Sequence, residues 1–416
     1  MKKLHLIFNL AGNGIPLFFA FFFMPILIEK FGMQRFGFIS IYWALIGSAS
    51  LFDFGLSRAL TYVVAKNNGV LNGIKRKTIL LVGIVTFLGF IAMLVLYFLS
   101  SKYFEENINI NSDLMYELNK SMIWIAIAVP LTTLSSALRG ILEGKKLFVF
   151  VNVIKVVSGV ASFGCLLFSD IFSPGLIGVA IVLVLLRLLM VVGFLAPVLI
   201  ELLKIKTHEV ICFKELLDVF KIGGWISISN IVSPLLLYAD KLILGMILSP
   251  VILTAYTTSF EFALRMLFVA GAISSVIYPY CVSAKKMELN KIIKQSYCYI
   301  FIAYFIPLLC MAFFSYPLIS SFINIEIASI SRDFIWIICI GILFNALAHI
   351  PFAIIQGRGR ADLTAKVHMI EAIPYIISLY YASTLYGATG AATVWCVRVI
   401  VDCISLIKIS QYILRE

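Results

Sequence analysis

Long apolar segments recur along the whole chain, and they constrain its fold more than any other feature. A helix needs roughly 20 apolar residues to cross the hydrocarbon core of a bilayer. Twelve segments meet that length, near residues 4–28, 36–62, 78–100, 121–139, 148–170, 176–200, 222–247, 251–282, 295–320, 333–356, 367–386 and 388–408. Backbone polar groups in hydrocarbon must be hydrogen-bonded within the protein, so such segments predict helices. We therefore expect an all-α, polytopic transmembrane protein.

The charged residues indicate how these helices are oriented. Only 13% of the residues are charged and 62% are hydrophobic, whereas soluble domains have about 25% and 45–50%. Two thirds of the 33 Lys and Arg residues lie at the termini and in the loops on one side of the predicted membrane. The positive-inside rule places that side, and both termini, in the cytoplasm. It also explains the net charge of +12 without a nucleic-acid partner. The first span is too long for a signal peptide and is expected to be retained.

Short loops exclude most enzyme classes. The longest loops are about residues 101–120 and 201–221, and neither can hold a soluble domain. There is no P-loop, and no Ser, His and Asp residues can be placed together in an aqueous loop. The eight cysteines show no paired spacing, so neither a disulfide framework nor a metal site is indicated. We expect no enzyme activity and no bound cofactor.

The two halves of the sequence resemble each other weakly. Glu143–Lys145 corresponds to Gln356–Arg358, and each is followed at almost the same distance by a Gly-x-x-Gly segment, at 175–178 and 387–390. Chance is the alternative explanation, because such glycines often serve only helix packing. The matched spacing favours a true repeat.

An internal repeat predicts the domain organisation. Each half holds six spans, so both halves have the same orientation and are related by a pseudo-two-fold axis along the membrane normal. We expect six-helix bundles at residues 1–203 and 222–416, joined by a cytoplasmic linker at 204–221. Transporters built in this way bind their substrate between the two halves.

Charged and ionisable residues inside the spans are the candidate functional residues, because burial in a membrane is costly unless they line a cavity or pair. They are Asp53, Arg58, Lys155, Arg187, Asp240, Lys241, Glu261, Arg265, His368, Glu371, Arg398 and Asp402. Three pairs are three or four residues apart on one helix face: Glu261 with Arg265, His368 with Glu371, and Arg398 with Asp402. These residues are either local ion pairs or groups that couple and gate transport.

Lys155 and Arg187 have no acid in their own spans, and they are the better candidates for a cationic cavity. With Arg398, they could bind an anionic group such as a pyrophosphate, whose geometry suits guanidinium donors. Lys155 lies near the end of its span, so its ammonium could instead reach for the membrane surface. Asn13 fits either helix packing or a polar lumen.

Asp53 and Arg58 lie in the cytoplasmic third of the second span and are interpreted as part of a cytoplasmic gate. Gly55 between them allows a bend or a close helix approach. Asp240 is a candidate cavity acid, and its neighbour Lys241 points elsewhere on the helix, towards the outer headgroups.

Several motifs resemble one known family. Residues 28–37, the segment Asp53–Ala59 with its pattern D-x-G-L-S-x-A, and Ala137–Gly140 followed by Glu143-Gly144 are similar to the N-terminal half of the O-antigen (Wzx-type) polysaccharide-unit flippases. These proteins belong to the multidrug/oligosaccharidyl-lipid/polysaccharide exporter superfamily. In the second half the resemblance is looser and rests on Gln356–Arg360 and the topology.

The resemblance implies a multi-pass protein of the bacterial inner membrane. Its substrate would be an undecaprenyl-pyrophosphate-linked oligosaccharide, moved to the periplasmic leaflet by alternating access and coupled to a proton or sodium gradient. Membrane lipids, a polysaccharide polymerase and a chain-length regulator are the implied partners.

Three other functions remain open. A multidrug cation antiporter shares the fold, but its lumen would favour acids, and the spans here hold six bases and five acids. A lipid-II-type flippase typically has two more spans. A polysaccharide polymerase would need a large periplasmic loop.

Overall fold

The computed structural model describes residues 3–107, 111–206, 213–283, 286–322 and 325–415, and every regular element in these ranges is a helix. Contacts divide the chain into two compact units, Lys2–Gly224 and Trp225–Glu416, here the N-terminal and C-terminal units. Residues 207–212 of the expected linker, and the terminal residues 1, 2 and 416, lie outside the described ranges. From residue 213 onward the expected linker is helical.

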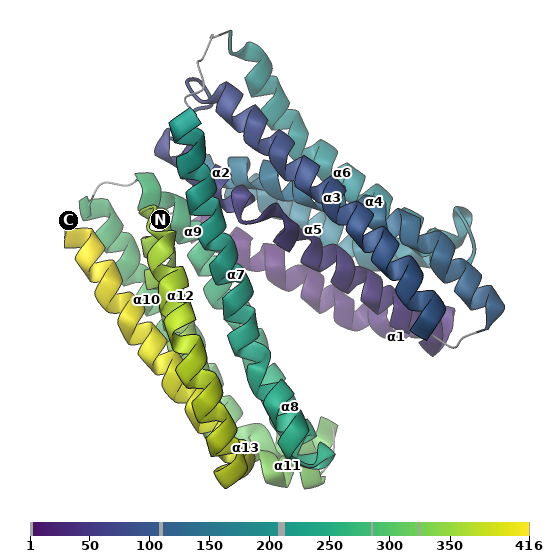
Figure 1. The fold of residues 1–416 in the computed structure, drawn as a ribbon, viewed down its shortest axis with the longest axis vertical. Helices are drawn as coiled ribbons and strands as arrows, with labels where there is room; N and C mark the ends of the chain where they lie inside the picture. Colours follow the sequence, from purple (N-terminus) through teal and green to yellow (C-terminus); the bar gives the residue numbers. More distant parts are fainter. Residues whose placement is uncertain (1–2, 108–110, 207–212, 284–285, 323–324, 416) are drawn as a thin grey trace. The chain divides into compact units, whose positions relative to one another are not determined.

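The N-terminal unit consists of long helices interrupted by short 3-10 segments (Figure 1). In order they are α1 (Lys3–Ser48), η1 (Ala49–Asp53), α2 (Leu56–Lys66), α3 (Lys75–Asn107), α4 (Ser112–Gly144), α5 (Phe148–Gly164), η2 (Cys165–Ile171) and α6 (Gly175–Lys204).

The C-terminal unit has the same character, and the boundary between the units falls within its first helix, α7 (Phe213–Ile247). It continues with α8 (Pro250–Leu264), η3 (Arg265–Leu267), α9 (Phe268–Ser283), α10 (Lys286–Phe322), α11 (Ile325–Ser331), α12 (Ile335–Gly357) and α13 (Ala361–Arg415).

The predicted all-α membrane fold is confirmed. Nine helices of the described residues are long and apolar enough to cross a membrane, or ten if the bent pair Ile7–Ala20 and Phe22–Gly32 forms one span. This count is below twelve partly because α13, with 55 residues, contains two expected spans of roughly 20 residues each. The two spans meet at Gly387, where φ is 60°. Gly32, with φ 75°, similarly divides α1.

The second expected span, 36–62, is not one continuous helix. Helix α1 ends at Ser48, η1 follows, and Phe54 (φ 49°) and Gly55 (φ 68°) adopt left-handed conformations before α2 begins. Apolar composition predicts burial in the membrane but not this break. The fourth span also extends further than expected, because α4 continues to Gly144. Arg139, at the predicted end of this span, therefore lies inside a helix.

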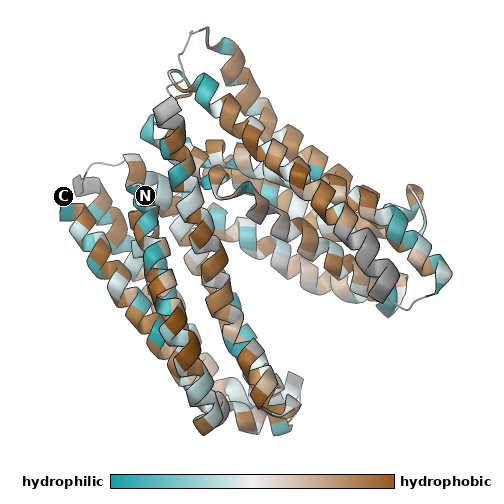
Figure 2. Cartoon of the chain, in the orientation of Figure 1, coloured by the Kyte–Doolittle hydropathy of each residue, from teal (hydrophilic) through white to brown (hydrophobic). Residues whose placement is uncertain are grey.

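Large apolar side chains cover the outside of the helices, as hydrocarbon solvation requires. Figure 2 shows hydrophobic residues along most of the helix lengths of each unit. Phe87 and Phe98 of α3 and Ile370 and Ile373 of α13 are among the most exposed. These surfaces fit a lipid environment.

Small residues bring specific helices of the N-terminal unit close together. A Cβ atom at Gly140 of α4 would overlap the backbone oxygen of Ser57 in α2, and one at Gly12 of α1 would overlap Asn152 of α5. Small residues let helices approach this closely, and at these two positions even a Cβ atom would clash. The close α2–α4 and α1–α5 contacts hold the polar residues of these four helices in one neighbourhood.

Candidate functional site

Three basic residues of the N-terminal unit come from three consecutive helices. They are Arg139 of α4, Lys155 of α5 and Arg187 of α6, named here the basic cluster. The positive charge of Arg139 acts on both Lys155 and Arg187. Like charges repel inside a low-dielectric protein, so this arrangement is stabilised when an anion is bound among them.

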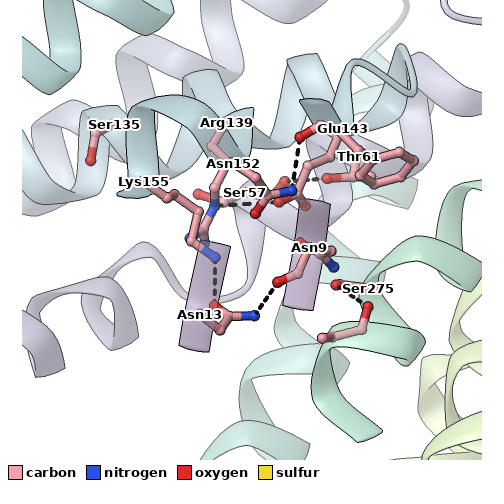
Figure 3. Close-up of polar contacts among 12 residues, drawn as sticks. Asn9, Asn13, Ser57, Thr61, Ser135, Arg139, Glu143, Asn152, Lys155 and Ser275 are labelled. Carbon is pink, nitrogen blue, oxygen red and sulfur yellow. Dashed lines mark hydrogen bonds and ion pairs between the residues drawn. The ribbon is translucent and has the colours of Figure 1, made fainter. Parts of the chain in front are cut away.

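The side chain of Lys155 is directed at α1. Its Nζ donates a hydrogen bond of 2.7 Å to Oδ1 of Asn13, and Nδ2 of Asn13 donates to the backbone oxygen of Asn9 at 3.1 Å (Figure 3). An ammonium held in this way points into the helix bundle, which argues against snorkelling to the membrane surface. Asn13 is neutral, so this bond does not compensate the positive charge of Lys155, on which the charge of Glu143 also acts.

Arg139 pairs with a carboxylate of its own helix. Its Nε lies 3.7 Å from Oε1 of Glu143, one helical turn later, and its charge also acts on Asp53. A separation of 3.7 Å is longer than a charge-assisted hydrogen bond of about 2.7–2.9 Å. The guanidinium therefore keeps donors that can turn to another acceptor.

Arg187 contacts a weak acceptor. Its NH1 lies 3.8 Å from Sδ of Met190, and the Ser158 hydroxyl approaches the same sulfur at 3.7 Å. A thioether accepts hydrogen bonds only weakly. Most of the hydrogen-bonding capacity of Arg187 is thus available for a ligand.

Asp53 stabilises the break in the second span. Its Oδ1 accepts a 2.7 Å hydrogen bond from the backbone N–H of Gly55, across the two left-handed residues. Arg58 lies half-buried in the first turns of α2. The bend expected at Gly55 is therefore present, and a gating role for these two residues stays a prediction.

Arg35, within the flippase-like motif at residues 28–37, has a structural role. Its Nε and NH2 donate to the two carboxylate oxygens of Glu117 at 3.0 and 2.7 Å, which raises the pKa of Arg35 above its ordinary value. Glu117 also accepts the backbone N–H of Leu176 at 3.1 Å. These bonds tie α1 and α4 to the start of α6.

In the C-terminal unit, four of the predicted residues lie together on α13. His368 and Glu371 precede the break at Gly387, and Arg398 and Asp402 follow it. Nε2 of His368 lies 3.6 Å from Oδ1 of Asp402, and the charge of Arg398 acts on the other three. The two pairs expected from helical spacing are in fact one group, named here the α13 cluster.

Many polar atoms of the α13 cluster are shielded but unpaired. Both carboxylate oxygens of Glu371, and Nε and NH1 of Arg398, have no hydrogen-bond partner among the described residues. The Arg398 guanidinium lies over the ring of Tyr375, 5.3 Å from its centroid. Of the three residues predicted for a cationic cavity, Lys155 and Arg187 belong to the N-terminal unit and Arg398 to the C-terminal unit, and a cavity shared by the three stays a prediction.

The remaining predicted residues have other partners than expected. Glu261 pairs with Lys241 of α7, whose Nζ lies 2.5 Å from Oε1, while Arg265 opens η3 and is exposed. The predictions that Glu261 pairs with Arg265 and that Lys241 points towards the outer headgroups are therefore wrong. Asp240 is fully buried, and its Oδ2 accepts a 2.5 Å hydrogen bond from the hydroxyl of Tyr256. This bond fixes α7 to α8.

Comparisons with known proteins place the chain among polysaccharide exporters. The sequence profile described as "Polysaccharide biosynthesis protein" matches residues 5–285. A relative from Shigella flexneri, described as "Putative O-antigen transporter", is 28% identical over 405 residues, which cover 96% of this chain and 95% of that protein.

Solved structures share the fold at low sequence identity. The Vibrio cholerae MATE transporter VcmN in its bent form has a TM-score of 0.80 and 13% identity, covering 99% of this chain and 96% of that one. A MOP-superfamily transporter from Pyrococcus furiosus has a TM-score of 0.76 and 13% identity, covering 99% and 94%. At this identity the likeness concerns the fold alone.

Proposed function

Because the chain belongs to the polysaccharide biosynthesis protein family, we propose that it translocates lipid-linked oligosaccharide repeat units across the bacterial inner membrane. The chain is a polysaccharide transporter and not an enzyme, in line with its family and its O-antigen-transporting relative. The proposal adds the form of the substrate, an undecaprenyl-pyrophosphate-linked oligosaccharide, and its direction, from the cytoplasmic to the periplasmic leaflet.

The basic cluster is the observation that carries this proposal. Two guanidinium groups and an ammonium from α4, α5 and α6 suit the two phosphates of a pyrophosphate, which Arg binds in bidentate geometry. Arg139 lies near the end of α4, and Lys155 lies two turns after the start of α5. The positive-inside orientation assigns these helix ends to the cytoplasmic side, where the substrate is loaded.

Alternating access then follows from ordinary binding energetics. The sugar-pyrophosphate head enters the polar interior, while the lipid chain stays in hydrocarbon. A bound substrate or ion shifts the equilibrium between inward and outward states only by its differential affinity for them. Coupling to a gradient of protons or sodium ions would drive net transport of the substrate in one direction.

A multidrug cation antiporter is the second candidate, and the carboxylates of the α13 cluster favour it. The charge of the basic cluster opposes it, because a cationic drug would be repelled there. The Pyrococcus furiosus relative of this fold is itself described as having a binding pocket of reverse polarity and a different function. A reversed charge is therefore compatible with the fold.

Complementation of a flippase-deficient bacterium tests the proposal, with surface polysaccharide as the readout. We expect the wild-type chain to restore surface polysaccharide in a suitable sugar background. Arg139→Gln and Arg187→Gln should each reduce it, while Arg332→Gln, an exposed arginine after α11, should not. Normal export by the Arg139→Gln/Arg187→Gln double variant would refute the role of the basic cluster. Drug resistance without polysaccharide export would favour the antiporter.

A further inference from the structure

We propose that the α13 cluster is a proton-binding site, in which Glu371 and Asp402 together hold one exchangeable proton beside Arg398. This inference deepens the proposed function by assigning the coupling ion and its site. Its basis is the geometry and burial of the cluster.

The predicted internal repeat aligns positions at which the two units carry different residues. Aligning Glu143-Gly144 with Gln356-Gly357 places Arg139 opposite Phe352 and Lys155 opposite His368 at one constant spacing. Two cations of the basic cluster are thus replaced by a phenyl ring and an imidazole, whose rings stack at 5.9 Å. Glu371 and Asp402 add carboxylates, so the chemistry of the C-terminal site suits a cation.

The burial of the cluster requires an explanation. His368 and Asp402 are 4% and 7% exposed, and Nδ1 of His368, Oδ1 of Asp402 and the hydroxyl of Tyr375 are shielded without hydrogen bonds among the described residues. Native proteins leave few buried polar atoms unpaired, and each such atom points to strain, a bound ion or water, or a functional role. In the α13 cluster several such unpaired atoms lie close together.

Charge counting gives the number of protons. With both carboxylates ionised, Arg398 positive and His368 neutral, the cluster carries one uncompensated negative charge. A net charge in a low-dielectric interior is costly, and one proton on the carboxylate pair removes it. Two interacting carboxylates share such a proton and titrate as a pair.

The proton belongs to the carboxylates rather than to His368. Nε2 of His368 is 3.6 Å from Oδ1 of Asp402, which is longer than a charge-assisted bond of about 2.7–2.9 Å. An imidazolium has two N–H donors, and here both would lack a close acceptor. The charge of Arg398 also repels a second cation at His368.

Groups on neighbouring helices leave this count unchanged. Asp240 of α7 and Tyr256 of α8 act on Tyr375 and not on Glu371 or Asp402, and the two Asp240 oxygens accept from the Tyr256 hydroxyl and the Lys241 backbone N–H. Tyr297 of α10 acts on Cys403, beside Asp402. From α12, Phe352 and the fully buried Gln356 are uncharged.

A proton suits the cluster better than a metal ion. In the described ranges no three His, Cys, Asp or Glu side chains converge as metal ligands do. Glu371 and Asp402 lie on opposite sides of the break at Gly387. The occupancy of the site therefore changes the attraction between the two halves of α13, and this change can bias a conformational equilibrium.

Infrared difference spectroscopy on the purified protein measures the proton directly. A protonated carboxylic acid has a C=O stretching band that an ionised carboxylate lacks. Spectra would be compared between about pH 6 and pH 9, where exposed Asp and Glu with pKa values near 4 stay ionised. We expect the wild-type protein to lose one carboxylic acid band as the pH rises.

The variants give opposite, countable outcomes. Glu371→Gln and Asp402→Asn should each abolish the titrating band, because one carboxylate with Arg398 is already neutral. Arg398→Gln should enlarge it. The band should be unchanged in His368→Asn and in Glu117→Gln, the control, which removes a carboxylate already paired with Arg35.

A band that persists in both carboxylate variants, or a titration removed only by His368→Asn, would overturn the assignment. Size-exclusion profiles would show whether each variant is folded. If the profile of Arg398→Gln is normal, its larger carboxylic acid band does not come from unfolding. The measurement does not use transport. A failed complementation with a normal band would therefore refute the proposed function and leave the proton site standing.

Discussion

Replacement of Arg139 by Gln should weaken the binding of a prenyl diphosphate about tenfold. Hydrogen bonds to charged groups contribute about 1.5–3 kcal/mol, and each 1.4 kcal/mol corresponds to a factor of ten in Kd. Arg139 already interacts with Glu143, 3.7 Å away, so we expect its contribution to phosphate binding to lie at the lower end of this range. Lys155 and Arg187 remain, and removal of Arg139 relieves the repulsion acting on both, so binding is weakened and not lost.

Farnesyl diphosphate, a short and soluble prenyl diphosphate, is a suitable probe for titration calorimetry on the purified protein. Arg332→Gln is the matched control and should bind as the wild type does. Glu143→Gln should bind up to a fewfold more tightly, because it frees the Arg139 guanidinium. If Arg139→Gln binds within twofold of the wild type while Glu143→Gln has no effect, Arg139 does not contact the phosphates and the reasoning fails.

Two further predictions concern the framework around this site, and thermal unfolding of the purified protein checks both. Gly140→Ala should lower the apparent Tm, since overpacking α4 against the Ser57 backbone oxygen costs about 1–3 kcal/mol. The control Gly83→Ala, where a Cβ meets open space, should leave the Tm unchanged. Equal Tm values for the two variants would disprove the close α2–α4 contact. Asp53→Ala should reduce the free energy of unfolding by about 1–3 kcal/mol, because it leaves the buried Gly55 N–H unpaired. Asp53→Asn retains an acceptor oxygen and should lose less. An equally large Tm loss in Asp53→Asn would show that the charge of Asp53, and not its hydrogen bond to the turn, stabilises the protein.

The fold was largely predictable because apolar length and loop charge are local properties of the sequence. Every expected span is mostly helical, although 36–62 and 251–282 are each divided by a 3-10 segment, and the family inferred from the D-x-G-L-S-x-A segment is confirmed. The breaks were harder to predict. Gly32, Gly55 and Gly387 take positive φ values, but other glycines in the same apolar segments remain helical, so glycine alone does not locate a break.

The candidate sites were predictable only in part, since ion-pair partners are chosen by tertiary packing. Helical spacing paired Glu261 with Arg265, whereas the structure pairs Glu261 with Lys241 on the preceding helix. The same spacing paired His368 with Glu371 and Arg398 with Asp402, but it could not show that both halves of the helix contribute to one cluster. Arg139 was missed because it lies at the predicted end of its span and was not counted among the charged residues inside the spans. Its i,i+4 relation to Glu143, beside the repeat motif, was the available signal.

The basic cluster takes its side chains from α4, α5 and α6, where Glu143 and Asp53 are the carboxylates that act on it among the described residues. Further carboxylates on these helices would pair with its cations and reduce its attraction for phosphate. Substrate binding and proton binding that each favour one conformation are coupled through the conformational equilibrium, and such coupling is reciprocal. If prenyl diphosphate binding shifts that equilibrium, it must change the proton affinity of the α13 cluster by the same factor by which protonation changes substrate affinity.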